Sequence, residues 1–409
     1  MQNRLLIDLT MKLLYFTIQI NMLGGLAKIV IDKINWLVDH GYDVTLCNIE
    51  RLEVVPAYPI DSRVKLVRGD ITTTPGGLLT RLKGVMGAIK RTKEIIAQER
   101  PDVIVNAHCP LVTWILPWIA GHTTLLSKLS PMHPALIVEM HQSRQGLEVF
   151  NRQFMRPFAR WVHRWSIRWI YSKYDKFVVL TNGDREVWNT KNCVTIPNFA
   201  TVEVKLQPST QEESSASAPA RHQIILLARL MPQKRIDLMI EVWARLAKDF
   251  PGWHVKVLGE GMLREDLERQ AHSLGVADSF LLLGAVKDVN AELEASDILC
   301  LTSEYEGFGI VLIEAMLKRV PVMAFEYVGV HDIINDGEDG FVVPFGDTDR
   351  YAERLRLLME STAERERLAD NALISVKKFD KEHVMQQWVN LFEKNNMDDR
   401  NSKKNPSLK

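Results

Sequence analysis

Short apolar runs alternate with longer stretches in which apolar residues recur every three or four positions, almost from end to end of the chain. A short run rich in β-branched residues predicts a buried strand, and the longer spacing predicts an amphipathic helix. Regular alternation of the two predicts parallel sheets covered by helices on both faces. We therefore expect an α/β protein built from doubly wound sheets.

The predicted strands fall into two groups. The first group comprises residues 12–17, 43–48, 102–106, 135–140 and 176–181, with a helix expected at 26–40. The second group comprises residues 223–229, 254–259, 279–283, 297–302 and 321–325. Between the groups lies a segment rich in Ser, Ala, Pro and Glu without any aromatic residue, which is typical of a linker.

The chain is thus expected to form two Rossmann-like domains, at residues 1–205 and 222–380, joined by a linker at 206–221. A helix at 381–395 carries a single apolar stripe, so we expect it to pack back towards the first domain. Residues 396–409 are polar, and we expect a disordered tail there.

Composition narrows the range of functions. The 409 residues include 51 basic and 51 acidic side chains, so no overall charge attracts the protein to nucleic acid. The four cysteines are far apart and lack CxxC spacing, which predicts free, buried thiols. Residues 13–27 and 109–127 are uncharged, but glycines or prolines interrupt both, so neither is expected to span a membrane.

One glycine-containing segment in the second half has the features of an anion site. Gly307 and Gly309 follow the strand at 297–302 and precede an apolar helix, so backbone N–H groups at the helix start can approach a phosphate. Glu306 precedes that helix and Glu314 lies about two turns into it, where both can accept hydrogen bonds from sugar hydroxyls. The spacing alone does not exclude the alternative that Glu306 is a solvated acid and Glu314 an acid on the helix surface.

Two cations follow the first strand of the second half. Arg229 ends the apolar run and Lys234 comes one turn later, so both lie at the carboxyl edge of the sheet, where α/β folds bind ligands. Fixed cations there can stabilise a departing diphosphate. An ordinary pair of cations at a helix start is the alternative. Gly259 ends the next strand and permits close approach of a ligand.

His141 ends the strand at 135–140, again at a carboxyl edge. A histidine at this position can serve the reaction or be structural, and the residue type alone does not separate the two roles. His108 has the same setting at the end of another predicted strand.

In their order along the chain, these motifs resemble the retaining family 4 glycosyltransferases of the GT-B fold, also called glycosyl transferases group 1. The resembling segments are Ala228-Arg-Leu230 with Lys234, Gly259-Glu-Gly261, Leu283-Gly284, Ser296-Asp297, the stretch from Glu306 to Glu314, Arg319-Val-Pro321 and Gly337-Glu-Asp-Gly340. The chain departs from the family pattern at Arg235 and at Gly329-Val330, where glycines are usual.

The resemblance implies a role for each candidate. Four catalytic residues are implied, namely Glu306 at the transferred sugar, His141 near it, and Arg229 and Lys234 at the donor diphosphate. The implied donor-binding residues are Gly25, Gly259, Val286, Gly307, Phe308, Gly309 and Glu314, with Val286 beside the base and Glu314 at the ribose. Transfer would occur on one face of the sugar, with the departing phosphate oxygen helping to remove the acceptor's proton. No cofactor and no essential metal are expected, and Asp347-Thr-Asp349 is interpreted as a helix N-cap.

A basic, aromatic stretch in the first half suggests a contact with anionic lipid. Residues 151–174 contain no acid, while arginines and tryptophans each recur every four positions, and Pro157 is expected to start or kink the helix. The predicted contact residues are Arg152, Arg156, Arg160, Trp161, Arg164, Trp165, Arg168 and Trp169. Residues 78–93 are also apolar and basic. The alternative is a buried aromatic face whose arginines reach water.

These observations together predict a retaining hexosyl- or N-acetylhexosaminyltransferase that uses a nucleotide-sugar donor and a lipid-linked saccharide acceptor. The first domain would bind the acceptor and the second the donor. We expect a cytoplasmic enzyme, peripheral at the inner face of the cell membrane, that acts in surface polysaccharide or oligosaccharide biosynthesis and binds no nucleic acid. The alternatives are a nucleotide-sugar epimerase or hydrolase of the same fold, and a non-catalytic, membrane-bound partner of a transferase.

Overall fold

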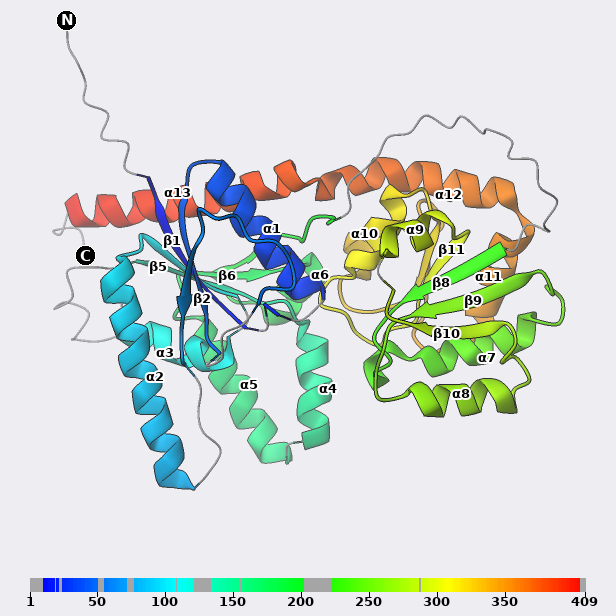
Figure 1. The fold of residues 1–409 in the computed structure, drawn as a ribbon, viewed down its shortest axis with the longest axis horizontal. Coiled ribbons are helices and arrows are strands. Elements are labelled where there is room, and N and C mark those ends of the chain that lie inside the picture. Colours follow the sequence, from blue (N-terminus) through cyan, green and yellow to red (C-terminus); the bar gives the residue numbers. More distant parts are fainter. Residues whose placement is uncertain are drawn as a thin grey trace, which may run out of the picture.

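The computed structural model describes residues 10–18, 20–21, 24–50, 55–71, 77–107, 109–120, 134–154, 156–201, 222–286 and 288–404. These residues form two α/β halves side by side, each with a twisted parallel sheet between helices (Figure 1). The predicted fold class is therefore confirmed. The linker expected at 206–221 lies outside the described residues.

The N-terminal sheet has the strand order β3-β2-β1-β4-β5-β6-β7, with every neighbouring pair parallel. Its strands are β1 (Lys12–Thr17), β2 (Asp43–Asn48), β3 (Lys65–Arg68), β4 (Val103–Ala107), β5 (Ala135–Glu139), β6 (Lys176–Val179) and β7 (Cys193–Thr195). Its helices are α1 (Gly25–Asp39), α2 (Leu78–Glu99), α3 (Pro110–Ile119), α4 (Arg144–Phe154), α5 (Pro157–Tyr171) and α6 (Asn182–Trp188).

The C-terminal sheet repeats this topology with the order β10-β9-β8-β11-β12-β13. Its strands are β8 (His222–Leu227), β9 (Trp253–Leu258), β10 (Phe280–Gly284), β11 (Ile298–Leu301), β12 (Val322–Phe325) and β13 (Phe341–Val343). The helices that follow are α7 (Ile236–Leu246), α8 (Arg264–Ser273), α9 (Val289–Glu294), α10 (Ile310–Leu317), α11 (Thr348–Glu360) and α12 (Thr362–Ser375), with 3-10 turns η2 (Pro232–Lys234), η3 (Val330–Asp332) and η4 (Val376–Phe379).

The order of strands sets the place of the site. In each sheet the order in which the chain adds strands reverses between the first and fourth strands, which are β1 and β4 in one half and β8 and β11 in the other. At such a reversal the following loops part and leave a crevice at the carboxyl ends of the strands, which is where doubly wound sheets bind ligands. The loops after β8 and β11 carry Arg229, Lys234 and Glu306.

All ten predicted strands are present, with small shifts at their ends. Three further strands, β3, β7 and β13, were not predicted. They are three or four residues long, and β3 and β7 lie at the two edges of their sheet, where partial exposure weakens the apolar signal.

Helix α13 (Lys381–Lys404) joins the end of the chain to the N-terminal half. Trp388 and Phe392 are buried in one cluster with Leu13, Tyr15 and residues of α1. The indole nitrogen of Trp36 also donates to Glu382 at 2.8 and 2.9 Å. The helix continues through residues 396–404, where a disordered tail was expected.

Replacing Trp388 with alanine tests this packing. Trp388 is 1% exposed, and truncating a buried tryptophan to alanine costs about 3–5 kcal/mol. We expect Trp388→Ala to lower the free energy of unfolding by that amount and to speed amide exchange in α1. Urea unfolding and hydrogen exchange measure both effects, with the exposed Lys394→Ala as control. Unchanged stability would show that α13 does not hold the N-terminal half together.

Candidate functional site

The side chains of Lys234 and Glu306 meet at the carboxyl edge of the C-terminal sheet. Lys234 Nζ lies 2.6 Å from Glu306 Oε1, and Ser303 Oγ donates to the same oxygen at 2.7 Å. The backbone holds this arrangement, because Thr302 Oγ1 donates to Lys234 O at 2.8 Å and Glu304 N donates to Gln233 O at 2.9 Å. The sequence named both residues, and the structure places them in direct contact.

Glu314 lies about one turn into α10 and has a different partner. The hydroxyl of Thr201 donates to Glu314 Oε1 at 2.6 Å. Burial raises the pKa of Glu314, while the Thr201 hydrogen bond and the nearby Lys28 act in the opposite direction. Glu306 and Glu314 therefore do not form a two-carboxylate pair, because each acid is held separately at a different depth of the site.

The loop between these two acids is shaped by its glycines. Gly309 adopts φ of 93°, which favours glycine, and caps the start of α10. Gly307 packs directly on the backbone carbonyl of His141, so that a Cβ atom at this position would collide with it. The side chain of Phe308 is buried against Phe379, with 5.4 Å between ring centroids. The structure thus turns the Phe308 side chain into the core, and only its backbone borders the loop.

Two predicted residues of the N-terminal half reach the same loop and helix. Gly25 begins α1, and a Cβ atom there would lie 3.3 Å from Cδ1 of Ile310, the first residue of α10. His141 follows β5, and its Nε2 lies 3.3 Å from Glu139 Oε1. His108 lies outside the described residues. The start of α10 is therefore bordered by both halves of the molecule.

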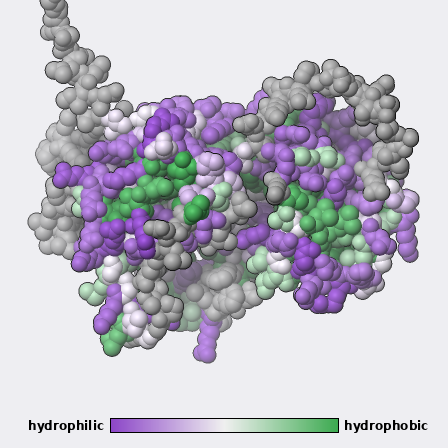
Figure 2. Space-filling view, in the orientation of Figure 1, coloured by the Kyte–Doolittle hydropathy of each residue, from purple (hydrophilic) through white to green (hydrophobic). Residues whose placement is uncertain are grey.

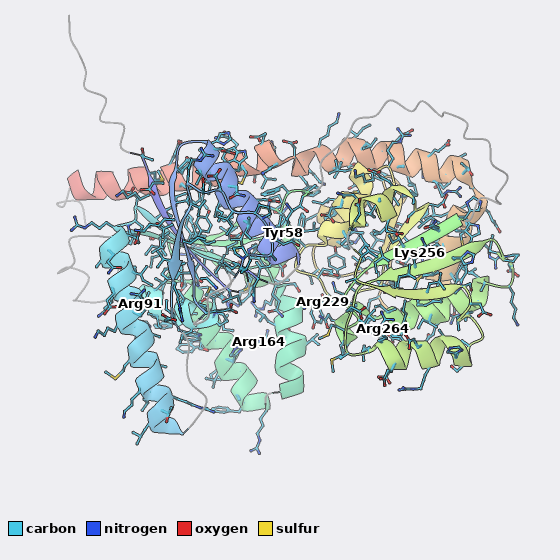
Figure 3. The ribbon with its side chains drawn as sticks, viewed as in Figure 1. Tyr58, Arg91, Arg164, Arg229, Lys256 and Arg264 are labelled. Atoms are coloured by element: carbon cyan, nitrogen blue, oxygen red, sulfur yellow. The ribbon has the colours of Figure 1, made fainter. Side chains whose placement is uncertain are left out.

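The remaining donor-site candidates lie farther along the same edge. Arg229 is exposed, and Figure 3 places it on the side of the C-terminal half that faces the N-terminal half. Gly259 has φ of 148° and packs tightly on the carbonyl of Ala228, while its N–H donates to Gly284 O at 2.8 Å. In the structure, the close packing at Gly259 is thus with the end of the neighbouring strand β8. Val286 packs on the cluster that includes Leu258 and Leu301.

Contacts between the halves involve residues that the sequence did not reveal. Gln145 of α4 donates to Glu304 O at 3.1 Å and accepts from Val328 N at 3.3 Å. Asp332 accepts from Asn182 Nδ2 at 2.8 Å and from Gly183 N at 3.1 Å, at the start of α6. Polar residues on two separate domains carry no periodic signal, so their pairing could not be predicted.

Pro157 starts helix α5, as the sequence predicted, so the basic aromatic stretch is divided between two helices. Helix α4 ends at Phe154 and α5 begins at Pro157, because proline lacks the N–H that a continuous helix needs and favours the first turn. Arg152 and Arg156 therefore do not continue the stripe of α5. The side chains of Arg152 and Arg160 lie outside those that the structure describes.

The exposed part of α5 is nonetheless apolar and basic. Phe158, Trp161 and Trp165 are 75%, 66% and 62% exposed. Arg164 and Arg168 are also exposed, with Arg164 lying 3.4 Å from Glu148. Trp169 instead packs partly into the core and lies 5.7 Å from the ring of Trp118.

Helix α2 adds a second apolar surface. Leu79, Leu82 and Met86 are exposed at its N-terminal end, which projects from the sheet on the same side as the junction of α4 and α5 (Figure 1). Figure 2 shows hydrophobic side chains at this projecting end, next to strongly hydrophilic ones. Among the described helices, none is both long enough and apolar enough to cross a bilayer.

Acids, histidines and cysteines are the side chains that could hold a metal ion. Within the described part of the chain, no three such residues are grouped so that they could hold an ion. Asp347 accepts from Arg350 N at 3.0 Å and caps α11, as predicted. The four cysteines are free and buried.

Two parallel-sheet domains that share a site between them define the architecture called GT-B. The family models for Glycosyltransferase Family 4 and for Glycosyl transferases group 1 match residues 23–203 and 209–374. The chain therefore belongs to the family 4 glycosyltransferases and has the GT-B fold.

Individual relatives agree with this assignment. The chain is 24% identical over 382 residues to the amylovoran biosynthesis glycosyltransferase AmsD of Erwinia amylovora, and the alignment covers 92% of this chain and 98% of that protein. It is 32% identical to a Campylobacter jejuni GalNAc-alpha-(1->4)-GalNAc-alpha-(1->3)-diNAcBac-PP-undecaprenol alpha-1,4-N-acetyl-D-galactosaminyltransferase over 41% of this chain and 47% of that one. The crystal structure of Anabaena Alr3699/HepE with UDP and glucose superposes with a TM-score of 0.70 at 17% identity, covering 94% and 100% of the two chains.

A buried acid beside the contact between the halves gives a test by pH. Burial raises the pKa of Asp184 to about 6, against the opposing effect of hydrogen bonds from Arg144 N and the Thr181 hydroxyl. Because this folded-state pKa lies above the unfolded value, ionising Asp184 costs stability as the pH rises from about 4 to about 6.

We therefore expect Asp184→Asn to stabilise the protein more at about pH 7.5 than at about pH 4, by up to roughly 2 kcal/mol. Urea unfolding at the two pH values measures the difference. The exposed Asp278→Asn is the matched control. An equal effect of Asp184→Asn on stability at both pH values would contradict the raised pKa of Asp184.

Proposed function

We propose that this chain is a retaining glycosyltransferase that moves a hexose or an N-acetylhexosamine from a nucleotide sugar to a hydroxyl group of a lipid-linked saccharide. The observation that carries the proposal is the loop from Ser303 to Gly309, which holds Glu306 beside Lys234 and also touches the backbone of His141. Cations for a leaving group and a residue of the opposite half thus border one loop.

The donor would lie along the start of α10. Lys234 and Arg229 supply positive charge for the diphosphate, and the first N–H groups of α10 add the favourable end of the helix dipole. Glu314 would accept a hydrogen bond from the ribose, and Glu306 from a hydroxyl of the transferred sugar. Gly25 faces the same helix start from the N-terminal half, where an added Cβ atom would lie 3.3 Å from Ile310 Cδ1.

The transfer step would occur on one face of the sugar. The bond from the anomeric carbon to the phosphate oxygen breaks with its electron pair going to that oxygen, and the acceptor oxygen bonds to the same face. The acceptor's proton passes to the departing phosphate oxygen. Lys234 and Arg229 stabilise the charge that develops there, so the proposal needs no metal ion.

The names of relatives support the class of acceptor and pathway. The Campylobacter relative acts on an undecaprenol-linked saccharide by its name, and the Erwinia relative belongs to amylovoran biosynthesis. We infer that this chain likewise extends a lipid-linked saccharide in surface polysaccharide or oligosaccharide assembly. The Anabaena structure contains UDP and glucose, which supports a nucleotide-sugar donor.

A lipid-linked acceptor requires access to a membrane surface. The exposed ends of α2 and α5 present leucine, methionine, phenylalanine and tryptophan with arginines nearby. Such a surface suits the boundary between anionic head groups and acyl chains. We propose that the N-terminal half contacts the inner face of the cell membrane through these helices while the donor site stays in the cytoplasm.

The role of Lys234 can be measured in a transfer assay with labelled nucleotide sugar and lipid-linked acceptor. Loss of one group that stabilises the leaving charge lowers kcat by about 100- to 1000-fold, and we expect this for Lys234→Ala. Lys256→Ala, which removes a cation on β9 paired with Glu292, should leave kcat unchanged. An unchanged kcat in Lys234→Ala would disprove the diphosphate assignment.

Three further readouts of the same assay address the rest of the proposal. We expect wild-type transfer to continue in excess chelator, and we expect the product to keep the anomeric configuration of the donor by NMR. Reversible loss of transfer with chelator would show a metal requirement. Release of free nucleotide without any acceptor at the rate of transfer would indicate a hydrolase or epimerase.

Membrane contact is tested by vesicle flotation with anionic phospholipid. We expect the triple variant Arg156→Gln, Arg160→Gln, Arg164→Gln to bind more weakly, because each cation near an anionic surface contributes about 1 kcal/mol. The matched control removes three exposed arginines of the C-terminal half, at positions 245, 269 and 350. Equal binding by the two triple variants would make α5 a structural helix.

A further inference from the structure

A cluster of charged side chains lies inside the N-terminal half, directly behind His141. Lys33 of α1 and Glu139 of β5 form an ion pair through Glu139 Oε1, and each side chain is 1% exposed. His141 Nε2 lies 3.3 Å from the same oxygen, which is an ion-pair distance without hydrogen-bond geometry, and this nitrogen has no hydrogen-bond partner among the described residues. The three side chains come from two elements, α1 and β5 with its following loop, that both lead into the proposed site.

An ion pair without access to water is costly, because both charges lose their hydration. Apolar side chains of similar size would fill the same space without this cost. Stability of the fold therefore does not explain the pair, and its contact with His141 gives a specific reason for placing a carboxylate there.

The direction of the electrostatic effects favours a charged carboxylate. Burial acts against ionisation of Glu139, but the charge of Lys33 and the contact with the His141 ring outweigh it, and the pKa of Glu139 is lowered. Burial lowers the pKa of Lys33, and the contact with Glu139 opposes that change. Lys33 thus serves as the counterion that keeps Glu139 available as an acceptor.

The end of the chain covers this cluster. Lys33 Nζ lies 3.8 Å from the centroid of the Trp388 ring of α13, where the face of an indole ring attracts a cation. Trp388 is buried together with Tyr15 and Ile137. Helix α13 therefore closes the pocket in which Lys33 and Glu139 are held.

A carboxylate beside one ring nitrogen determines what the other nitrogen can do. An acceptor next to Nε2 favours the proton on Nε2, which leaves Nδ1 as the nitrogen with a free lone pair. The backbone of His141 is meanwhile held against Gly307 of the opposite half. Both the position of the histidine and its proton arrangement are thus set from outside the substrate site.

We propose that Glu139 is a positioning residue for His141, fixed in place by Lys33, so that Nδ1 of the ring accepts a hydrogen bond from a hydroxyl of the donor sugar or the acceptor. This inference rests on the proposed function, because it assumes that His141 lies at the reacting sugar. It gives Glu139 and Lys33, which both lie outside the donor site, a role in positioning His141.

The test compares the variants His141→Ala, Glu139→Gln, the double variant Lys33→Met with Glu139→Gln, and the triple variant that adds His141→Ala. The Lys33→Met, Glu139→Gln variant removes both charges together and so avoids a lone buried lysine. Thr92→Ala, which alters a buried polar side chain of α2 in the same half, is the control and should leave kcat unchanged. Each variant is measured for folding by circular dichroism, for binding of a nucleoside diphosphate, and for kcat and KM of transfer.

We expect the Lys33→Met, Glu139→Gln variant to fold, to bind nucleoside diphosphate as the wild type does, and to lose about 10- to 100-fold in kcat. The triple variant should be no slower than His141→Ala, because all three changes remove the same effect. A kcat equal to that of the wild type, or losses that multiply with His141→Ala, would overturn the inference and leave the proposed function standing. A wild-type kcat in His141→Ala would overturn both the inference and the role of His141 in the proposed function.

A spectroscopic readout is independent of turnover. In protein labelled with ¹⁵N-histidine, the His141 signals are those absent from His141→Ala. We expect Nε2 to carry the proton in the wild type and the preference to be lost in the Lys33→Met, Glu139→Gln variant. A proton fixed on Nδ1 in the wild type would contradict the proposed arrangement.

Discussion

The packing of Gly307 on the carbonyl of His141 is the contact on which the arrangement of the site depends. One residue belongs to the loop after β11 and the other to the loop after β5, so the contact joins the carboxyl edges of the two sheets. Any side chain at position 307 would separate these edges. Because of this approach, the start of α10 is bordered by residues of both halves.

Around this contact, each half contributes a different kind of chemistry. The C-terminal half supplies exposed or partly exposed cations and a helix start, which suit a diphosphate. The N-terminal half supplies a histidine supported by a buried ion pair. Gln145 and Asp332 connect the halves beside the site by hydrogen bonds to backbone groups. The contacts that join the halves therefore also bring the two sides of the site together.

The sequence predicted most of the fold, because strands buried on both faces give continuous apolar runs and α-helices give a clear three-to-four spacing. Lys234, Glu306 and Glu314 were also predicted, although only the structure shows that Lys234 binds one acid and Thr201 the other. Short edge strands such as β3 were not predicted, because their exposure leaves no continuous apolar run to mark them. For Phe308 the sequence predicted a donor-binding residue but not the direction of its side chain, which the structure buries against Phe379.

Other features depend on tertiary contacts that no local pattern carries. From the sequence alone, Lys33 is one polar position of an amphipathic helix. In the structure it is buried against Glu139, which is 106 residues away in sequence. Such residues can be recognised only when the fold has brought distant elements together.

The central claim is that a nucleotide-sugar site lies between the halves at the start of α10. Hydrogen exchange measured by mass spectrometry, with and without a saturating nucleoside diphosphate that binds the protein, tests it most directly. The account predicts slower exchange in residues 229–235, in residues 303–316 and at the start of α1. Binding that slows exchange elsewhere, while these three segments remain unchanged, would contradict it.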